Sequence, residues 1–280
     1  MGVRVAWIGL GNMGGGMARN LINKGNLGSP LVLYNRTISR ADALCNEVGH
    51  TKATVVASIV EAVERADLIF TSLSNDDALK DAMEQALQID VAGKKFVDCS
   101  TVHPDVANNV AARVANNGAD FVAMPAIDFV KPYITGVIGR RAIEFRDEPV
   151  GKAQILKLIA NMFILSVNEI VAEGMTFAEK ASVDPNKLLE LLSVLFGGPY
   201  TVYGARMVGG DYHKKEVPVE IALKDARHAL HIAEDVGCAI PSLDAAAKNL
   251  EAVKDQRGPT ADSSSVYGLS RTRNGLSLEN

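Results

Sequence analysis

Two patterns of apolar and polar positions alternate along the first 125 residues. Short apolar runs, typical of buried parallel strands, are followed by longer stretches with the three-to-four-residue spacing of amphipathic helices. The runs predict strands at 3–8, 31–34, 68–73, 95–99 and 120–124. The spacing predicts a helix ending near Gly25 and others at 58–66, 76–87 and 104–116. Such alternation predicts an α/β domain with a doubly wound, mostly parallel sheet.

Residues 153–182 form one long apolar stretch with no proline and a single glycine. It is apolar on almost every side, which predicts a helix buried in the protein or between partner chains. Lys157, Asn161 and Asn168 lie within about 40° of one another on this helix, at about 100° per residue. A polar stripe with an ammonium group is unfavourable there unless it is used. Alternatively, Lys157 extends to the surface and the amides satisfy backbone groups.

The rest of the chain predicts helices only, at about 185–196, 219–236 and 242–256. Residues 259–265 predict a polar loop, and the end of the chain, with Arg271 and Arg273, predicts a polar and partly mobile terminus. The pattern therefore divides the chain into an α/β domain, 1–150, and an all-helical domain, 151–280, that begins with the long helix.

Composition narrows the class of protein. A chain of 280 residues with 48% hydrophobic and 22% charged residues is ordinary for a globular protein with room for two domains. The net charge of −4 gives no basic surplus, so we expect no nucleic-acid partner. The polar residues inside the long apolar stretch argue against a membrane span.

The three cysteines are widely spaced, which predicts neither a disulfide framework nor a zinc site and fits a reducing compartment. With no signal or transit segment in the sequence, we expect a cytoplasmic protein. His228 and His231 stand three residues apart, but no third ligand accompanies them, so no metal site is predicted.

A glycine motif of the form G-x-G-x-x-G follows the first strand and precedes the first helix, the context in which it predicts a dinucleotide site. Gly9 permits the tight turn, Gly11 lets the backbone approach a pyrophosphate, and Gly14 allows close helix–strand contact. Alternatively, the glycine motif forms a turn that binds no ligand. The cofactor-binding residues predicted here are Gly9, Leu10, Gly11, Asn12, Met13 and Gly14.

The second predicted strand ends in Asn35-Arg36-Thr37. An acidic residue in this place would bind the ribose hydroxyls of NAD. Here no carboxylate repels a 2′-phosphate, and the guanidinium of Arg36 can bind one with its planar fork. The sequence therefore favours NADP over NAD, although Arg36 could instead only stack on adenine.

Two further predicted strands end in polar residues, at Ser72-Leu73-Ser74-Asn75 and at Ser100-Thr101. Ligands of doubly wound sheets bind beyond these carboxyl ends. Capping of the following helices by Ser74 and Thr101 is the alternative, and it does not exclude ligand contact.

Several motifs together resemble the β-hydroxyacid dehydrogenase family, the group of 3-hydroxyisobutyrate dehydrogenase and the related 6-phosphogluconate dehydrogenase. The motifs are GLGNMGGGMARNL, YNRT, FVDCSTVHPDVANNVA and LKLIAN, and the resemblance resumes in ALKDARHALHIAEDVGCAIPSLDAA and in DSSSVYGLSRTRNGLSLEN. It covers nearly the whole chain and is specific for the family, though not for a substrate.

The resemblance implies a Rossmann domain joined by the long helix to an all-helical domain. It implies that Lys157, in a K-x-x-x-N signature, is the general acid/base on the substrate hydroxyl, and that Asn161 orients this lysine and the substrate. A lysine desolvated on a buried helix exchanges its proton with an alcohol more readily. The resemblance also implies contacts to the cofactor from Leu73, Ser74, Thr101 and Lys224.

One departure from the family pattern follows the strand that ends at Met124-Pro125. The family usually has a Ser-Gly-Gly-type loop there, which binds the substrate carboxylate, and then further strands. This chain has Ala126-Ile127-Asp128-Phe129 and continues at once with the segment that precedes the helical domain. We therefore expect a missing stretch between about Ala126 and Asp128, a sheet truncated at one edge and no substrate-binding loop.

Two hypotheses follow. The first is an NADP-dependent oxidoreductase that acts on a small β-hydroxyacid or its aldehyde counterpart, and the presence of Lys157 and Asn161 favours it. The second is a catalytically impaired NADP-binding member of the same fold that acts as an assembly or sensing module, which the missing loop favours. Under either hypothesis the apolar long helix needs a partner surface, so we expect a homodimer or homotetramer.

Overall fold

The computed structural model describes residues 2–123, 131–139, 143, 145 and 148–280. The expected missing stretch at about Ala126–Asp128 lies outside the described residues. Contacts between residues divide the chain into two compact units, Met1–Leu156 and Lys157–Asn280. They are called unit 1 and unit 2 below, and each is described by itself.

Unit 1 is built on a six-stranded sheet in the order β3-β2-β1-β4-β5-β6, and every neighbouring pair is parallel. This order confirms the predicted doubly wound sheet. The sequence patterns missed β3, a strand of only three residues, and the helix α2 before it. The strands are β1 (Val5–Ile8), β2 (Leu31–Tyr34), β3 (Ala53–Val55), β4 (Leu68–Thr71), β5 (Lys95–Asp98) and β6 (Asp120–Ala123).

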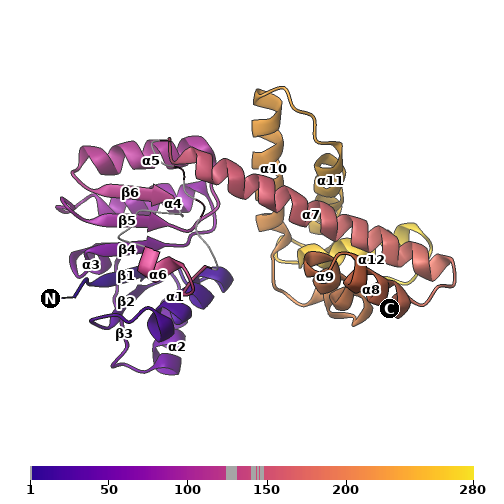
Figure 1. The fold of residues 1–280 in the computed structure, drawn as a ribbon, viewed down its shortest axis with the longest axis horizontal. Coiled ribbons are helices and arrows are strands. Elements are labelled where there is room, and N and C mark those ends of the chain that lie inside the picture. The colour runs from indigo at the N-terminus through magenta and orange to yellow at the C-terminus, as the bar shows by residue number, and fades with distance from the viewer. Residues whose placement is uncertain (1, 124–130, 140–142, 144, 146–147) are drawn as a thin grey trace. The chain divides into compact units, whose positions relative to one another are not determined.

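Helices cover both faces of this sheet (Figure 1). Successive residues of a strand point to opposite faces. Trp7 therefore packs with α1 and α2 and stacks on Phe70 with ring centroids 5.3 Å apart, while Ile8 packs with α3, α4 and α5. One face carries α1 (Asn12–Lys24), α2 (Ile38–Val48) and α6 (Lys131–Ile134), and the other carries α3 (Ile59–Glu64), α4 (Asp76–Ala86) and α5 (Pro104–Asn116).

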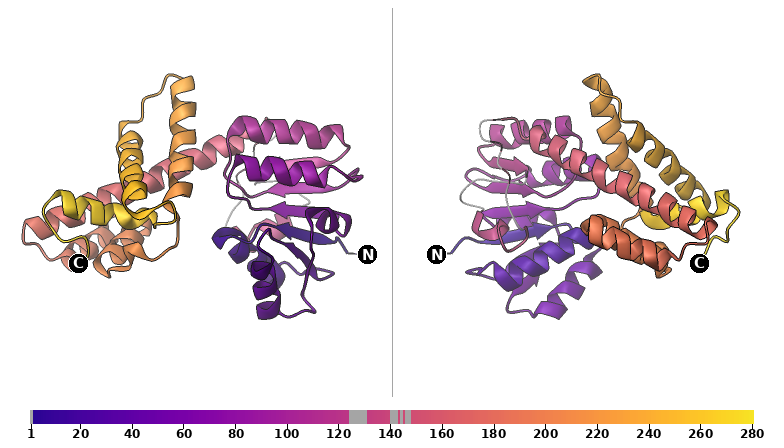
Figure 2. Two further views of the ribbon diagram at one scale, coloured as in Figure 1. Left: turned by 180° about the vertical axis from the view of Figure 1, so that it is seen from behind. Right: turned by 45° about the vertical axis from the view of Figure 1, so that its right-hand side comes forward.

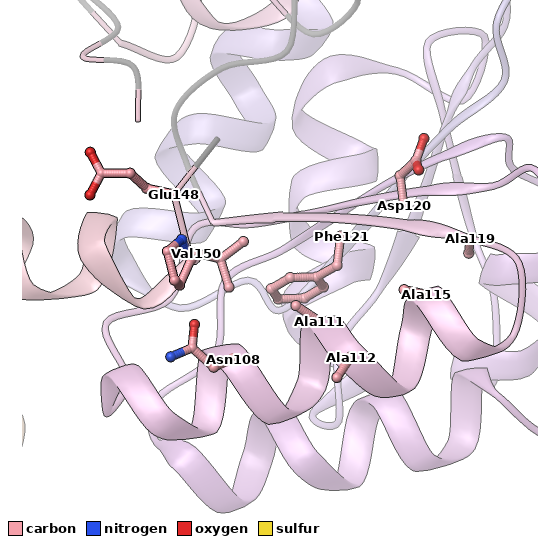
Figure 3. Close-up of a pocket in the computed structure, with 10 residues that line it drawn as sticks. Asn108, Ala111, Ala112, Ala115, Ala119, Asp120, Phe121, Glu148 and Val150 are labelled. Atoms are coloured by element: carbon pink, nitrogen blue, oxygen red, sulfur yellow. The ribbon is translucent and has the colours of Figure 1, made fainter. Parts of the chain in front are cut away.

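A shallow hollow of about 670 Å³ lies beside β6, the last strand of the sheet in the part of the chain that the structure describes. Figure 3 shows the small side chains of α5 on one side of it and Phe121 and Val150 on the other. Whether the sheet is truncated after β6 depends on residues outside the described ones, so the truncation stays a prediction.

Unit 2 is helical throughout, as predicted. Figures 1 and 2 show α10 and α11 packed side by side. The helix α9 was missed, because Gly197-Gly198-Pro199 reads as a stop signal, whereas Pro199 occupies the first turn of a new helix, where proline is favourable. The helices are α7 (Gly151–Lys180, beginning in unit 1), α8 (Pro185–Leu195), α9 (Gly198–Val208), α10 (Val219–Asp235), α11 (Pro241–Arg257) and α12 (Val266–Arg273).

The long helix α7 is less buried than its sequence predicts. Only 33% of its most apolar 18-residue window is buried, although by length and composition this helix could cross a membrane. Phe163 and Phe177 are 61% and 75% exposed, while Leu158, Val171 and Met175 belong to the core of unit 2. Within the single chain the helix is therefore not buried on all sides, and its burial between partner chains stays a prediction.

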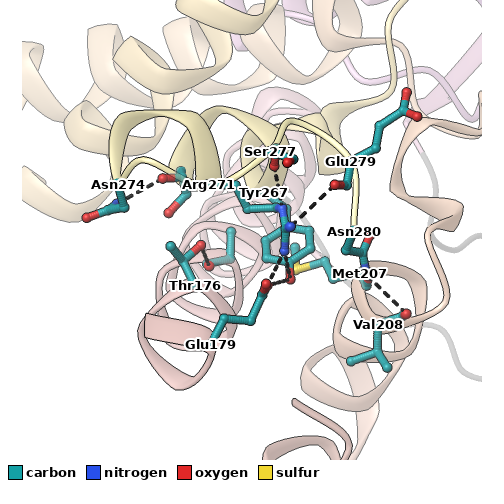
Figure 4. Close-up of polar contacts among 12 residues, drawn as sticks. Thr176, Glu179, Met207, Val208, Tyr267, Arg271, Asn274, Ser277, Glu279 and Asn280 are labelled. Carbon is teal, nitrogen blue, oxygen red and sulfur yellow. Dashed lines mark hydrogen bonds and ion pairs between the residues drawn. The ribbon is translucent and has the colours of Figure 1, made fainter. Parts of the chain in front are cut away.

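Buried polar contacts hold part of the C-terminal segment, which differs from the predicted polar loop at residues 263–265 and from the predicted polar end at Arg271. Ser263–Ser265 form a buried 3-10 turn, and Arg271 is 4% exposed. Figure 4 shows the guanidinium of Arg271 between Glu179 on α7 and the carbonyl oxygens of Ser277 and Glu279. Buried polar groups are stable only when they are paired in this way.

Candidate functional site

The glycine turn after β1 is packed too closely for side chains at two of its three glycines. Gly9 has a φ of +97°, and a Cβ there would lie 2.3 Å from the carbonyl oxygen of Ser72. A Cβ on Gly14 would lie 2.2 Å from the carbonyl oxygen of Gly9. A Cβ on Gly11 would meet nothing within 4 Å. Gly9 and Gly14 are therefore required by packing, whereas Gly11 borders open space, as expected where a pyrophosphate approaches.

The helix that follows the turn leaves its amino end open to an anion. Its N-cap is Gly11, which supplies no side-chain cap, and its first turn has no acidic residue. By contrast, α4 is capped by Asn75, which accepts a hydrogen bond from Ala78 N at 2.9 Å. A helix N-terminus with no side chain at its N-cap and no acidic residue in its first turn favours a phosphate, so the turn fits the pyrophosphate of a dinucleotide.

Asn35 braces the turn from the end of β2. Its Oδ1 accepts a hydrogen bond from Leu10 N at 2.8 Å, and its Nδ2 donates to the carbonyl oxygen of Thr37 at 2.8 Å. The structure thus brings the predicted residues at 35–37 next to the turn, and Arg36 and Thr37 are exposed there.

A buried carboxylate joins the ends of β4 and β5. Asp98 is 1% exposed, and its Oδ1 accepts hydrogen bonds from Thr71 Oγ1 at 2.7 Å and from Ser100 Oγ at 2.6 Å. Ser100 Oγ in turn accepts a hydrogen bond from Leu73 N at 2.8 Å. The network fixes the segments that carry Leu73, Ser74 and Thr101. The strand pattern gave no reason to single out Asp98, although the motif FVDCSTVHPDVANNVA contains it.

The alternative role of Ser74 and Thr101 as helix caps is wrong. The cap of α4 is Asn75 and the cap of α5 is His103, each through a side chain that accepts a backbone N–H. Ser74 and Thr101 precede these caps and lie on the segments that follow the carboxyl ends of β4 and β5.

The neighbouring Cys99 is not a nucleophile in this arrangement. Desolvation, with a further contribution from the carboxylate of Asp98, raises the pKa of the Cys99 thiol well above its ordinary value. The thiol therefore stays protonated at neutral pH, and a protonated thiol is a weak nucleophile.

In unit 2, two of the predicted residues meet at a second buried carboxylate. Asn161 Nδ2 donates to Asp225 Oδ2 at 2.7 Å, and Lys224 Nζ forms an ion pair with Asp225 Oδ1 at 3.0 Å. Asp225 is 7% exposed. It is part of the motif ALKDARHALHIAEDVGCAIPSLDAA, but nothing in the sequence indicated its role between Asn161 and Lys224.

The polar residues Lys157 and Asn168 of α7 lie in different environments. Asn168 is buried and donates to the carbonyl oxygen of Ser263 at 3.1 Å, so this amide satisfies a backbone group. Lys157 is exposed, because the neighbouring Leu158 takes the buried position of this turn. The expectation of a desolvated Lys157 is therefore wrong for the chain as the structure describes it.

Both units match known sequence families. Residues 4–127 match the NAD-binding domain of 6-phosphogluconate dehydrogenase, and residues 151–270 match the NAD-binding domain of NADP-dependent 3-hydroxyisobutyrate dehydrogenase. The chain is also 32% identical to the NADH-dependent oxidoreductase ucdB of Aspergillus ustus, over 94% of this chain and 98% of that protein. The chain belongs to the β-hydroxyacid dehydrogenase family. The comparisons therefore support an NAD(P)-dependent oxidoreductase of this family.

Other relatives show the range of this family. Glyoxylate/succinic semialdehyde reductase 2 of Arabidopsis thaliana is 30% identical, over 91% of this chain and 76% of that protein. The cytokine-like nuclear factor N-PAC of Xenopus tropicalis is 25% identical, over 94% of this chain and 52% of that protein. In fold, the chain is similar to 3-hydroxyisobutyrate dehydrogenase of Salmonella typhimurium, with a TM-score of 0.82 at 18% identity over 95% of this chain and 99% of that one.

The sequence alignments span more positions than the number of residues that this chain contributes to them. The alignment with the Aspergillus relative runs over 289 positions but takes in only 94% of 280 residues, so about 26 positions have no counterpart here. A missing stretch in this chain would produce such a difference. That the stretch lies near Ala126 stays a prediction.

The environments of Gly14 and Gly11 predict two different outcomes for substitution by alanine. Gly14→Ala should lower the free energy of unfolding by about 1–3 kcal/mol, because the new methyl group overlaps Gly9. Gly11→Ala should leave the melting temperature unchanged and weaken dinucleotide affinity about tenfold or more, because its methyl group enters the pyrophosphate space. Thermal unfolding and fluorescence titration with NADPH measure the two effects.

Gly16→Ala in α1 is the matched control, since a Cβ there also meets nothing within 4 Å. It should leave cofactor affinity unchanged and, if anything, stabilise the helix by up to about 1 kcal/mol. Equal cofactor affinity in the Gly11 and Gly16 variants would contradict the assignment of the pyrophosphate space.

Proposed function

We propose that this protein is an NADP-dependent oxidoreductase that transfers hydride between the nicotinamide and a small β-hydroxyacid or aldehyde-acid substrate, with Lys157 as general acid/base. The glycine turn, with its open space at Gly11 and uncapped helix, carries the proposal, because it provides a dinucleotide site in a chain of this family. The K-x-x-x-N signature on α7 adds the group that this chemistry needs for proton transfer.

The proposed roles follow from chemistry. The nicotinamide, when bound, takes the hydride and both electrons of the carbinol C–H bond. Lys157 in its amine form accepts the hydroxyl proton as the carbonyl group forms, and returns a proton in the reverse direction. Asp225 holds the Nδ2 group of Asn161, which leaves Oδ1 of the same amide to accept a hydrogen bond from the lysine or the substrate. We propose cofactor contacts from Leu73, Ser74, Thr101 and Lys224.

The proposed preference for NADP over NAD is argued from the residues at the amino end of α2. This helix has no side-chain cap and no acidic residue in its first turn, and Arg36 and Arg40 are exposed on either side of its amino end. Asn35, which stands where NAD enzymes have a carboxylate, bonds to the glycine turn. This arrangement favours a 2′-phosphate. The Aspergillus relative is named for NADH, so the preference needs a direct test.

We also propose that the protein is a homo-oligomer, with a second copy packed on the apolar residues that α7 and α8 expose. Phe163, Ile170 and Phe177 follow one another at intervals of seven residues, so they form one line along α7, and each is at least half exposed. None of the residues of the apolar helix α8 is fully buried. The exposed apolar residues of α8 are Leu191, Val194 and Leu195, and the exposed Phe196 follows directly after this helix.

The exposed area fits a dimer interface. With about 200 Å² per aromatic side chain, Phe163, Phe177 and Phe196 together expose on the order of 400 Å². The aliphatic residues of α7 and α8 add a comparable area, which approaches the ~800 Å² that each partner buries in an interface of standard size. A second copy presents the same line of residues, so a two-fold axis would pair the two surfaces.

A second candidate function is an NADP-binding assembly or sensing module with impaired catalysis. Two observations favour it: the alignment positions that have no counterpart in this chain, and a relative that is named a nuclear factor rather than an oxidoreductase. The two functions differ in turnover. A module of this kind binds NADPH but oxidises no short β-hydroxyacid and reduces no aldehyde acid such as glyoxylate or succinic semialdehyde.

Arg36→Asp should reverse the cofactor preference. The wild-type protein should gain more thermal stability from NADPH than from NADH, and the variant should lose about 10- to 100-fold in NADPH affinity with the charge-assisted hydrogen bonds to the 2′-phosphate. Arg113→Asp, the same charge change on an exposed position of α5, is the control. Equal affinity of the wild type for both cofactors would exclude a role of Arg36 in phosphate binding.

Lys157→Ala should reduce turnover about 10²- to 10⁴-fold and leave NADPH affinity nearly unchanged, because the lysine moves a proton rather than binding the dinucleotide. The assay follows nicotinamide absorbance with a panel of short β-hydroxyacids and aldehyde acids. Lys152→Ala, at an exposed position in the first turn of α7, should keep wild-type turnover. Wild-type turnover in the Lys157 variant would disprove the acid/base assignment, and no turnover in the wild type would favour the module.

The wild-type protein should be a dimer or tetramer by light scattering, and Phe163→Glu combined with Phe177→Glu should give a folded monomer. Buried in a dimer interface, the two new carboxylates would be desolvated and unpaired. Val236→Glu, at a valine that is 73% exposed after α10, is the control and should leave the oligomer intact. A monomeric wild-type protein would contradict the proposal, and vesicle binding abolished by the phenylalanine variant would assign the surface to a membrane.

A further inference from the structure

A buried glutamine in the first turn of α7 holds the segment that follows β5. Gln154 is 3% exposed. Its Nε2 donates to the carbonyl oxygen of Ser100 at 3.1 Å, and its Oε1 accepts a hydrogen bond from Val102 N at 3.3 Å. One amide therefore binds the backbone groups on both sides of Thr101, the residue that we propose to contact the cofactor.

The same segment is fixed from the sheet by the network of Asp98. Ser100 donates its hydroxyl to this carboxylate and accepts Leu73 N, so the ends of β4 and β5 and the first turn of α7 belong to one hydrogen-bonded unit. Its members Asp98, Ser100 and Gln154 are buried. Buried hydrogen bonds of this kind rigidify a site, because water cannot replace them.

Lys157 follows Gln154 by three residues, nearly one turn of the same helix. We propose that Gln154 is a positioning residue for the reaction: it fixes the first turn of α7, one turn before Lys157, to the backbone on both sides of Thr101. The inference rests on the proposed function. Displacing a catalytic group by about 1 Å can reduce the rate on the order of 100-fold, so a loss of this link should affect turnover before binding.

Gln154→Met retains the approximate shape of the side chain and removes both hydrogen bonds. It should lower kcat about 10- to 100-fold while the Kd for NADPH stays within about threefold. Gln85→Met, the same change at an exposed position of α4, is the control and should leave kcat unchanged. An unchanged kcat in the Gln154→Met variant would overturn the proposal. A loss of NADPH affinity as large as the loss of kcat would also overturn it, because the substitution would then act on cofactor binding.

Gln154→Glu separates positioning from a merely structural role. A protonated carboxyl group can donate to Ser100 O and accept from Val102 N, whereas the ionised form places negative charge against the Ser100 carbonyl. Burial favours the protonated form. The ratio of variant to wild-type kcat should therefore rise as the pH is lowered from about 8 to 6, and a ratio independent of pH would contradict the proposal.

A double-variant cycle tests whether Gln154 acts through Lys157. Adding Gln154→Met to Lys157→Ala should lower the residual turnover by less than about twofold, because residues that act as a unit are not additive. Full additivity would overturn the proposal while leaving the function intact. Absence of wild-type turnover with every substrate of the panel would instead refute the proposed function itself, and the positioning role with it.

Discussion

The close approach of three backbone segments at the glycine turn is the constraint on which this protein depends. Gly9 and Gly14 leave no room for a Cβ, so β1, α1 and the end of β4 meet without side chains between them. This contact lies between β1 and β4, where the strand order reverses, and it turns the uncapped end of α1 toward the carboxyl edge of the sheet. The segments after β2 and β5 are then fixed on either side of it by hydrogen bonds.

Each unit has a buried carboxylate that organises polar groups within that unit. Asp98 joins the ends of β4 and β5 in unit 1, and Asp225 joins Asn161 to Lys224 in unit 2. Neither is among the residues that the family motifs assign to cofactor or substrate. Each acts by holding other groups in place, and in a buried site such bonds are strong because the dielectric is low.

The expected missing stretch near Ala126 would affect the part of the chain that follows β6. The nucleotide turn and its supports are complete, whereas the hollow between α5 and β6 marks an edge of the sheet with little cover among the described residues. Alignment positions without a counterpart here agree with a shortened chain. The glycine turn of the proposed dinucleotide site follows β1, which β4 and β5 separate from β6 in the sheet order, so the expected missing stretch would leave that part of the fold unchanged.

The sequence by itself determined the parallel sheet, the long helix, the glycine turn and the family, because these follow from local periodicity and from residues adjacent in the chain. Only the tertiary structure decided that Lys157 is exposed, that Arg271 is buried and that Asp225 accepts the amide of Asn161. Asn161 and Asp225 are 64 residues apart, and Arg271 and Glu179 are 92 apart. Burial and pairing of a polar side chain depend on such distant partners, which the periodicity of a single segment does not encode.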